Sequence, residues 1–388
     1  MTDMRWPMVV LRDVLELSLD PERVDPRATY PTLGVYGFGR GVITSKPPVQ
    51  GSEIAATVLH RVHAGQFIYS KLKAFEGAFA VVPSDGDGRF VSNEFPTFCA
   101  RSDSLDTHYL GWLFRVPSTW DAVSSDSVGI GARRERLHPN QLLAFRVPLP
   151  PLDEQRRIVA RLDAVSARLN ARAEAAERQE AELAAMLQQA FARITADSPR
   201  ARMADVAPLV RREAAIEPET LYTEIGIRSF FRGMFPRRTM AGAEFTWQSL
   251  YRIEAGDVVF SNLMAWERGI ALAGAADAGC VGNHRMLTCA ADRDRLLPGF
   301  LFFYFTTREG FSQVEAASPG SIARNKTLSP QGLAAIEVPL PSLDAQQWFE
   351  ALRLKADAIR SLNAAAADDA AALMPAMLHQ IFADKTKS

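Results

Sequence analysis

The chain has 388 residues, of which 47% are hydrophobic and 23% charged, with a mean hydropathy of −0.07 and a net charge of −1. This composition excludes a disordered, collagen-like or membrane-embedded chain, and the balanced charge supplies no global field that would attract a polyanion. Three cysteines without a CxxC pair exclude a disulfide framework and a cysteine-rich zinc site, and the charged N-terminal stretch lacks the apolar segment of a signal peptide, so we expect a cytoplasmic protein.

An internal repeat organises the chain. Residues 30–41, YPTLGVYGFGRG, return as 222–233, YTEIGIRSFFRG, and residues 64–76 return as 255–267. Three shorter islands recur in the same order: 91–93 as 281–283, 133–139 as 324–330, and 147–155 as 338–346. The offset stays between 190 and 192 residues, so the chain contains two copies of one unit.

Each copy begins with a globular stretch of mixed strand and helix signals. Residues 65–70, 78–82 and 256–261 carry β-branched and aromatic side chains between Gly and Pro, which predicts strands. The apolar run 296–307, LLPGFLFFYFTT, predicts a buried helix or a buried strand, and periodicity does not decide between them. The expected fold class is therefore α+β, with two similar mixed α/β domains.

A long helix follows each globular stretch. Residues 154–194 contain no Pro or Gly, and Asp153 lies in the first turn, where the helix dipole favours a carboxylate. About 40 residues at ~1.5 Å each would make a helix near 60 Å long. The second copy carries a similar segment from 343 to 382, which Pro375 is expected to kink near its end.

The two helices are expected to pack together, because apolar residues recur along both near heptad spacing. We expect an antiparallel coiled coil with a pseudo-twofold relation between the copies, and a parallel pair remains the alternative. The expected seam residues are Leu162, Val165, Leu169, Leu183 and Met186 in the first helix and Ile359, Leu362, Leu373 and Met377 in the second. The expected divisions are a first domain at 1–147, a first helix at 148–198, a second domain at 199–338 and a second helix at 339–388.

Motifs for catalysis are largely missing from the sequence. Residues 37–41, GFGRG, lack the third glycine of a dinucleotide fingerprint and the Lys-Ser/Thr of a P-loop. Glu76 and Glu267 recur, but one carboxylate per copy makes a poor acid–base pair. Neither an amino-methyltransferase motif nor a nuclease-type carboxylate cluster is found. We therefore predict a recognition role, with no catalytic residue, metal or cofactor in this chain.

A two-fold repeat suits duplex DNA, whose half-sites lie at helical-turn separations. Arg40/Arg232, Asn93/Asn283 and Arg133/Arg324 recur and are expected to hold the scaffold or phosphates, whereas varying positions are expected to read bases. A solvated surface role remains the alternative for each residue. The candidate DNA-binding residues are Arg40, Lys71, Lys73, Asn93, Arg133, Arg134, Arg136, Arg228, Arg232, Arg237, Asn262, Arg268, Asn283, His284, Arg285, Arg324, Asn325 and Lys326.

A family resemblance is carried by residues 147–158, VPLPPLDEQRRI, which precede the first long helix and return as 338–346, VPLPSLDAQ. This paired motif resembles the specificity subunit of type I restriction–modification systems, as do 6–14, WPMVVLRDV, and 318–326, SPGSIARNK. The resemblance covers essentially the whole chain. The second copy departs from the pattern, with Ala345 in place of Glu and Trp348-Phe349 after the Gln pair.

The resemblance implies a non-catalytic phage-defence subunit with two target-recognition domains and two helical spacers. Its implied partners are double-stranded DNA, modification subunits carrying S-adenosylmethionine, and restriction subunits using ATP and Mg²⁺, with no membrane. Two alternatives stay open: a coiled-coil adaptor without sequence specificity, and a methyltransferase or nuclease component with unrecognised catalytic residues.

The two copies are expected to read different short sequences, because they differ at aligned positions. The expected differences are Lys71/Asn262, Lys73/Met264, Glu94/His284 and Phe95/Arg285. A rigid spacer would place the two half-sites about one helical turn apart, or about 10 bp centre to centre.

Overall fold

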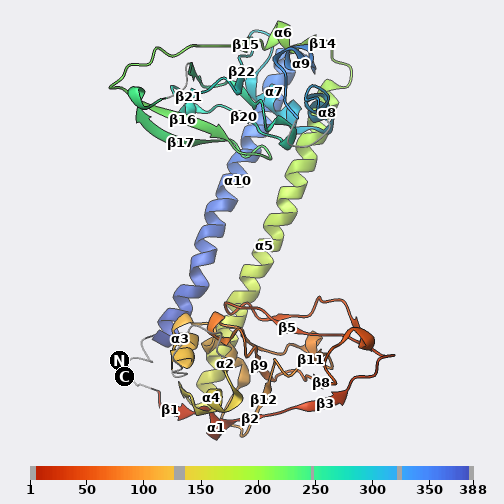
Figure 1. Cartoon of the computed structure of the whole chain (residues 1–388), viewed down its shortest axis with the longest axis vertical. Coiled ribbons are helices and arrows are strands. Elements are labelled where there is room, and N and C mark those ends of the chain that lie inside the picture. The colour runs from red at the N-terminus through yellow and green to blue at the C-terminus, as the bar shows by residue number, and fades with distance from the viewer. Residues whose placement is uncertain (1–5, 126–135, 246–248, 321–325, 384–388) are drawn as a thin grey trace. The chain divides into compact units, whose positions relative to one another are not determined.

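The computed structural model describes residues 6–125, 136–245, 249–320 and 326–383 (Figure 1). The chain folds as two compact units: unit 1 comprises Met1–Ala175 and Ala364–Ser388, and unit 2 comprises Ala176–Asn363. Each unit therefore contains one globular stretch together with half of each long helix. Both units mix helices and strands, which confirms the expected fold class.

Unit 1 is built on an antiparallel four-stranded sheet of order β10-β9-β12-β2. Its strands are β2 (Leu15–Leu17), β9 (Phe67–Tyr69), β10 (Phe79–Val81) and β12 (Thr97–Ala100). A three-stranded sheet joins β11 (Phe90–Val91), β8 (Val58–Arg61) and β3 (Asp20–Arg23). Two-stranded pairs are β1 (Met8–Val10) with β13 (Arg146–Pro148), β4 (Thr29–Tyr30) with β7 (Val49–Gln50), and β5 (Gly34–Val35) with β6 (Val42–Ile43). The short helices are α1 (Leu11–Val14), α2 (Thr107–Leu113), α3 (Pro117–Ser125) and α4 (Pro139–Ala144), with the 3-10 turns η1 (Gly51–Glu53), η2 (Ala74–Glu76) and η3 (Ser84–Gly86).

The central strand β9 is buried on both of its faces, as its unbroken apolar sequence predicts. Successive side chains alternate, so Phe67 and Tyr69 enter the main core of unit 1, while Ile68 joins a second cluster with Leu33 and Val62. The strands expected at 65–70 and 78–82 are confirmed as β9 and β10.

Unit 2 contains two four-stranded sheets, of order β15-β22-β19-β20 and β17-β16-β21-β18. The strands of the first sheet are β15 (Leu209–Val210), β19 (Val258–Ser261), β20 (Ile270–Leu272) and β22 (Met286–Cys289). Those of the second are β16 (Leu221–Ile227), β17 (Met234–Ala241), β18 (Tyr251–Arg252) and β21 (Val281–Gly282). A separate pair joins β14 (Arg200–Arg202) to β23 (Glu337–Pro339). The short helices are α6 (Met203–Val206), α7 (Pro298–Thr306), α8 (Arg308–Ala316) and α9 (Pro330–Ala335), with the 3-10 turns η4 (Gly242–Glu244), η5 (Ala265–Glu267) and η6 (Ala275–Asp277).

The strand expected at 256–261 is confirmed as β19, and the ambiguous apolar run at 296–307 is the helix α7. Pro298 occupies the first turn of α7, where its missing N–H costs nothing, and Phe300 and Phe305 are fully buried.

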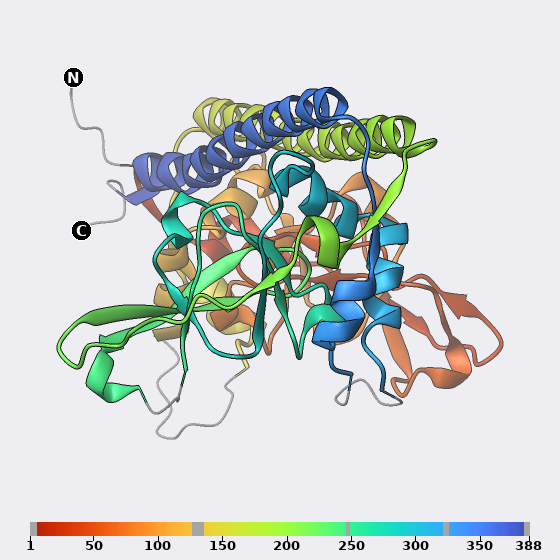
Figure 2. The same ribbon diagram turned by 90° about the horizontal axis from the view of Figure 1, so that it is seen from above.

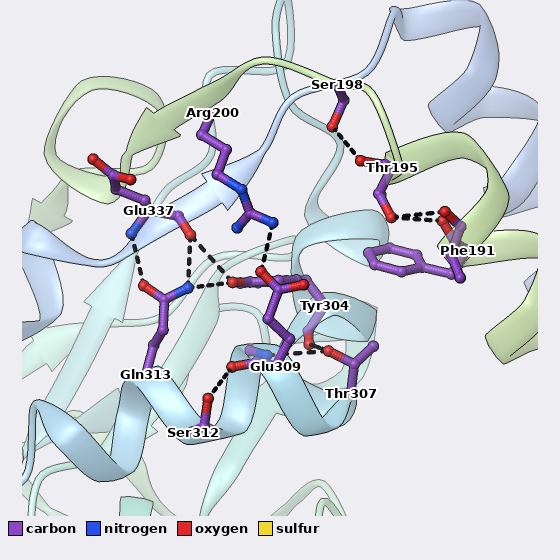
Figure 3. Close-up of polar contacts among 12 residues, drawn as sticks. Phe191, Thr195, Ser198, Arg200, Tyr304, Thr307, Glu309, Ser312, Gln313 and Glu337 are labelled. Atoms are coloured by element: carbon purple, nitrogen blue, oxygen red, sulfur yellow. Dashed lines mark hydrogen bonds and ion pairs between the residues drawn. The ribbon is translucent and has the colours of Figure 1, made fainter.

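A polar network ties α7 and α8 to the strand pair β14–β23 within unit 2 (Figure 3). The Tyr304 hydroxyl donates to the Glu337 carbonyl oxygen at 3.1 Å, and the Gln313 amide donates to the same oxygen at 2.9 Å and also to the Tyr304 hydroxyl. Arg200 pairs with Glu309 at 2.5 Å. Burial, reinforced by Glu309, raises the pKa of Tyr304. The neutral phenol therefore remains a hydrogen-bond donor, as this network requires.

The long helices are α5 (Leu152–Thr195) and α10 (Leu343–Leu378), the latter followed by a π-helical segment, His379–Ala383. Pro375 lies inside α10, four residues before the π-helical segment begins. Within unit 2, Arg360 of α10 binds Glu180 of α5 at 2.8 Å, and Asn363 donates to Gln179 at 2.7 Å. The partner number falls as the α10 number rises, so the two helices run antiparallel, as expected.

The glutamine of the repeated PLPxLDxQ sequence joins the start of each long helix to a neighbouring segment of the same unit by hydrogen bonds. Gln155 accepts from the Asp106 N–H at 2.9 Å and donates to the Ser104 and Pro150 carbonyls, each at 2.8 Å. Gln346 makes the same three bonds in unit 2, with Leu297, Arg295 and Pro341. Both side chains are fully buried.

The structure corrects the helix seam at three positions. Met186, Leu362 and Leu373 are 39%, 71% and 44% exposed, so they do not belong to the seam. The residue after each one faces inward instead: Leu187 is 1% exposed, Asn363 bonds to Gln179, and Met374 packs on the core of unit 1. One residue turns a helix by about 100°, so a heptad frame misplaced by one position selects the wrong face.

The remaining expected seam residues are at least partly buried. Leu162 and Met377 enter the core of unit 1, whereas Val165, Leu169, Leu183 and Ile359 are half-buried.

Candidate nucleic-acid interface

Each unit carries a tight loop between two strands, at 36–41 in unit 1 and 228–233 in unit 2. The Tyr36 N–H donates to the Gly41 carbonyl, and the Arg228 N–H to the Gly233 carbonyl, each at 2.9 Å. In the loops, Phe38 and Phe230 have φ values of 60° and 62°, in the left-handed region that a bulky residue seldom adopts. The repeated sequence therefore gives the same backbone in both units.

The loop rests on the 3-10 turn η2 or η5 through main-chain hydrogen bonds. In unit 1 the Phe38 N–H donates to the Glu76 carbonyl at 2.6 Å, and the Gly39 N–H to the Gly77 carbonyl at 3.0 Å. In unit 2 the N–H groups of Phe230 and Phe231 donate to the carbonyls of Glu267 and Arg268, at 3.0 and 2.9 Å. Both recurring glutamates thus hold the loop through their main-chain carbonyls, and the Glu267 side chain also accepts from the Ser229 hydroxyl at 3.2 Å.

A third segment, residues 92–95 in unit 1 and 283–286 in unit 2, lies beside the same turn. In unit 1 the Lys71 N–H donates to the Glu94 carbonyl at 3.0 Å, and the Leu137 N–H donates to the Lys71 carbonyl at 3.0 Å. In unit 2 the Asn262 N–H donates to the Arg285 carbonyl at 2.8 Å, and the Leu328 N–H to the Asn262 carbonyl at 2.9 Å. The tight loop, the 3-10 turn and the third segment are far apart in the sequence but lie together in each unit. We call the surface that these three segments form the loop cluster.

The hydrogen bonds of the third segment correct the sequence alignment by one residue. Glu94 N–H donates to the Ser92 hydroxyl and Arg285 N–H to the Asn283 side chain, which pairs Ser92 with Asn283. Asn93 then corresponds to His284, and Glu94 to Arg285, so the expected pairs Asn93/Asn283, Glu94/His284 and Phe95/Arg285 are wrong. Phe95 corresponds to Met286, because each N–H donates to the carbonyl three residues earlier. At matched positions, a carboxylate in unit 1 is therefore replaced by a guanidinium in unit 2.

Most predicted contact residues within the described ranges are exposed. The exposed residues are Arg40, Lys73, Asn93, Arg136, Arg228, Arg232, Arg237, Arg268, His284 and Arg285. Lys71, Asn262 and Lys326 are half-buried, and Asn283 is 6% exposed. Arg133, Arg134, Arg324 and Asn325 lie outside the described residues.

Several of these cations stack on aromatic rings, which fixes their direction. The Arg40 guanidinium lies 5.1 Å from the Tyr36 ring centre, and that of Arg228 lies 4.9 Å from the Phe235 ring centre. Arg268 lies 5.2 Å from the Phe311 ring centre, and Lys326 lies 5.9 Å from that of Trp266. A stacked guanidinium keeps its edge N–H groups available to an anionic partner.

The hairpin that carries the loop is one continuous ladder in unit 2, where β16 pairs with β17, whereas in unit 1 it is divided into the pairs β4–β7 and β5–β6. The β16–β17 hairpin extends away from the rest of unit 2 (Figures 1 and 2). The Glu224 side chain on β16 is 1% exposed and is held by the Nε of Arg238 at 2.7 Å and Nη1 of Arg237 at 3.7 Å. Asn283 donates to the same carboxylate at 3.4 Å. Both arginine side chains remain substantially exposed, at 43% and 59%.

The residue equivalent to Glu224 in unit 1 is Thr32, since Thr32 bridges Phe90 in parallel as Glu224 bridges Val281. Asn93, which corresponds to His284 and not to Asn283, contacts the buried His60 ring at 2.5 Å. Sequence reasoning missed Glu224, because an acidic residue inside a strand gives no local sign of its distant partners. It also left Arg211 out, whose guanidinium braces the turn by donating to the His284 and Met286 carbonyls at 3.1 Å each.

Among the described residues, no three His, Cys, Asp or Glu side chains are arranged to hold a metal ion. In the same ranges, no helix combines the length and apolarity needed to cross a membrane.

No protein-family model and no curated protein matches the sequence. Solved structures do match. The HsdS subunit from Thermoanaerobacter tengcongensis is 19% identical, with a TM-score of 0.56 over 98% of this chain and 97% of that one. A chain from a structure concerned with complex assembly and conformational transition of the type I restriction–modification system is 20% identical, with a TM-score of 0.62 over 97% of both chains. The type I S subunit from M. genitalium is 11% identical, with a TM-score of 0.54 over 98% of this chain and 97% of that one. The chain therefore has the fold of the S subunits of type I restriction–modification systems.

Proposed function

We propose that this chain is the specificity subunit of a type I restriction–modification complex and binds a bipartite duplex DNA target. The observation that carries the proposal is the duplicated loop cluster: two units of one fold present the same three segments, held by the same main-chain hydrogen bonds. Each cluster exposes arginine or lysine beside an exposed aromatic ring. This combination matches the phosphates and base edges of nucleic acid.

The two units are proposed to read different half-sites. Gly77, Lys73 and Glu94 of unit 1 are replaced by Arg268, Met264 and Arg285 in unit 2, while the backbone contacts are retained. On the β16–β17 hairpin, Arg237 and Arg238 hold Glu224, for which unit 1 has Thr32, and a two-stranded ribbon fits the DNA major groove. Direct base recognition by these side chains would give unit 2 its own preference.

The chain is proposed to contribute no catalytic step. Modification subunits would supply S-adenosylmethionine chemistry, and restriction subunits would supply ATP-driven action with Mg²⁺, both docking on the long helices and the flanks of the units. A structural neighbour that belongs to a study of type I complex assembly supports the existence of such partners. A DNA target inside the cell places the complex in the cytoplasm.

The direct test is methylome sequencing of cells that carry the complete system, with and without this chain. We expect a two-part methylated sequence whose halves are about 10 bp apart centre to centre, and which disappears without the chain. Exchanging residues 1–146 for those of a related protein should change one half and leave the other half and the gap unchanged. Inserting four residues near Arg178, about 6 Å of helix, should alter the gap or abolish methylation.

Four results would contradict the proposal. A continuous target, or an exchange that rewrites both halves, would exclude two separate readers. Equal and weak binding to all duplexes at controlled salt would favour the adaptor. Methyl transfer by the highly purified chain alone would favour the enzyme.

A further inference from the structure

Two exposed phenylalanines lie at the same place in the two units. Phe38 is 65% exposed and Phe230 is 58% exposed, and both lie in the tight loop that rests on η2 or η5. Leaving such a ring in water forgoes the burial that stabilises a core phenylalanine. Stability of the chain alone therefore does not explain a phenylalanine at this position in both copies.

The backbone at these residues adds a second cost. A φ near +60° is unfavourable for a bulky side chain and is readily adopted by Gly or Asn. The neighbours of the ring differ between the copies, with Gly37 and Gly39 in unit 1 but Ser229 and Phe231 in unit 2. The ring has been kept where the surrounding residues have changed, which indicates a role for the ring itself.

The chemistry beside each ring favours a partner that is both flat and anionic. The Arg40 guanidinium lies 6.0 Å from the Phe38 ring centre, and the Arg232 guanidinium lies 5.9 Å from the Phe230 ring centre. An apolar ring next to a phosphate-binding cation matches a base step and its adjoining phosphate, and aromatic or aliphatic wedges of this kind unstack base steps in duplex DNA.

We propose that Phe38 and Phe230 are base-contacting wedges, one for each half-site, and that Arg40 and Arg232 hold the adjoining phosphates. This inference rests on the proposed function and deepens it. Each ring contacts a base step directly, and the left-handed turn, fixed by its two main-chain bonds to η2 or η5, holds the ring outward before DNA arrives.

The test uses the full chain with its modification subunits and a 30-bp duplex that the wild-type complex has selected from a random duplex library. 2-Aminopurine is placed at successive positions of both half-sites. The wild-type complex should raise its fluorescence at one step in each half. Phe38→Asn should abolish one signal and Phe230→Asn the other, with binding weakened about 5- to 150-fold and the salt dependence unchanged. Asn tolerates the left-handed turn, so these variants remove the ring without disturbing the loop.

Matched controls separate the ring from exposed apolar surface and from charge. Leu17→Ala and Leu221→Ala remove side chains that are 44% and 69% exposed outside the loops, and both variants should bind as wild type does. Arg40→Ala should lower the salt slope by about 0.9 while the fluorescence signals remain.

The outcomes distinguish this inference from the function on which it rests. A wild-type complex that selects no sequence would overturn both. Sequence-selective binding with wild-type affinity and fluorescence in both Asn variants would overturn the wedge alone, as would loss of both signals from a single variant. Loss of binding to anionic lipid vesicles, with duplex binding unchanged, would assign the rings to a membrane instead.

Discussion

The two buried glutamines at the start of the long helices, Gln155 and Gln346, give the sharpest prediction about stability. Gln155→Ala and Gln346→Ala each remove a fully buried amide that makes three hydrogen bonds of 2.8–2.9 Å to main-chain groups. Each substitution leaves one N–H and two carbonyls without that partner. Because each bond joins a helix start to a neighbouring segment, the loss should loosen the junction between the helix and its unit.

The magnitude follows from how far water can reach each group. The Pro150 carbonyl bond is buried, so that carbonyl loses its partner at a cost of about 1–3 kcal/mol. The bonds to Asp106 and Ser104 are partly buried, so water can replace them in part, at about 0.5–1 kcal/mol each. The sum of about 2–5 kcal/mol is a large share of the roughly 5–15 kcal/mol that stabilises a typical domain. The same estimate applies to Gln346.

The assay is hydrogen exchange by mass spectrometry on the full chain, read unit by unit, because a chain of two units need not unfold in one step. Gln155→Ala should accelerate exchange around Asp106 and the start of α5, and Gln346→Ala around Leu297 and the start of α10. Gln347→Ala, which removes the exposed neighbouring glutamine, is the matched control and should change neither region. Opening free energies within about 0.5 kcal/mol of wild type in both buried variants would refute the reasoning.

Three further predictions test other parts of the structure. Leu162→Asp places a charge in the core of unit 1 and should prevent a stable fold, whereas Leu362→Asp, at a position that is 71% exposed, should leave the thermal unfolding curve nearly unchanged. Equal melting curves for the two variants would contradict the corrected helix seam. Glu224→Gln keeps the size of the side chain but removes the charge that holds Arg237 and Arg238, so selection from a random duplex library should change in the half-site of unit 2 only, and an unchanged sequence would exclude this role. Burial, reinforced by Asp257, raises the pKa of Cys289 from 9.0 to about 12, so its thiol should resist iodoacetamide at pH 8.5 until unit 2 unfolds. Because the folded state favours the neutral thiol, the contribution of Cys289 to the free energy of unfolding is complete below pH 9 and is lost as the pH rises toward 12. Unfolding of wild type and Cys289→Ser, measured as a function of pH, would reveal this loss.

Local signals predicted the elements that depend on local chemistry. The absence of Pro and Gly over 154–194 marks α5, and β9 and β19 follow from β-branched and aromatic runs between Gly and Pro. The run that became α7 was ambiguous because it is apolar on all sides, and only its packing between strands and the long helices of unit 2 decides the conformation. The repeat could be found because both copies keep the same short islands.

The predictions from the sequence were wrong where a shift of one residue changes which side chain faces inward or which residues correspond. Met186 and Leu187 are both apolar, and the sequence contains no feature that says which one enters the core of unit 2. The Asn93/Asn283 match relied on residue identity, whereas the structure keeps the position of a hydrogen-bond acceptor and allows Ser92 to serve in one unit and Asn283 in the other. Glu224 depends on Arg238, 14 residues away, and Asn283, 59 residues away, so its role emerges only in three dimensions.

The hydrogen bonds that hold the loops explain why some residues recur in both units and others differ between them. The Tyr30 and Tyr222 hydroxyls each accept from a main-chain N–H five residues earlier, at 2.8 and 3.1 Å, and so both tyrosines remain. The contacts that both units share among the loop, the 3-10 turn and the third segment are made by main-chain atoms, which are nearly the same for any residue that tolerates the turn. Arg268 can therefore replace Gly77 and Arg285 can replace Glu94 without loss of these bonds. A scaffold held through its backbone leaves the side chains of the loop cluster free to diverge, which allows two copies of one fold to present different side chains on the same surface.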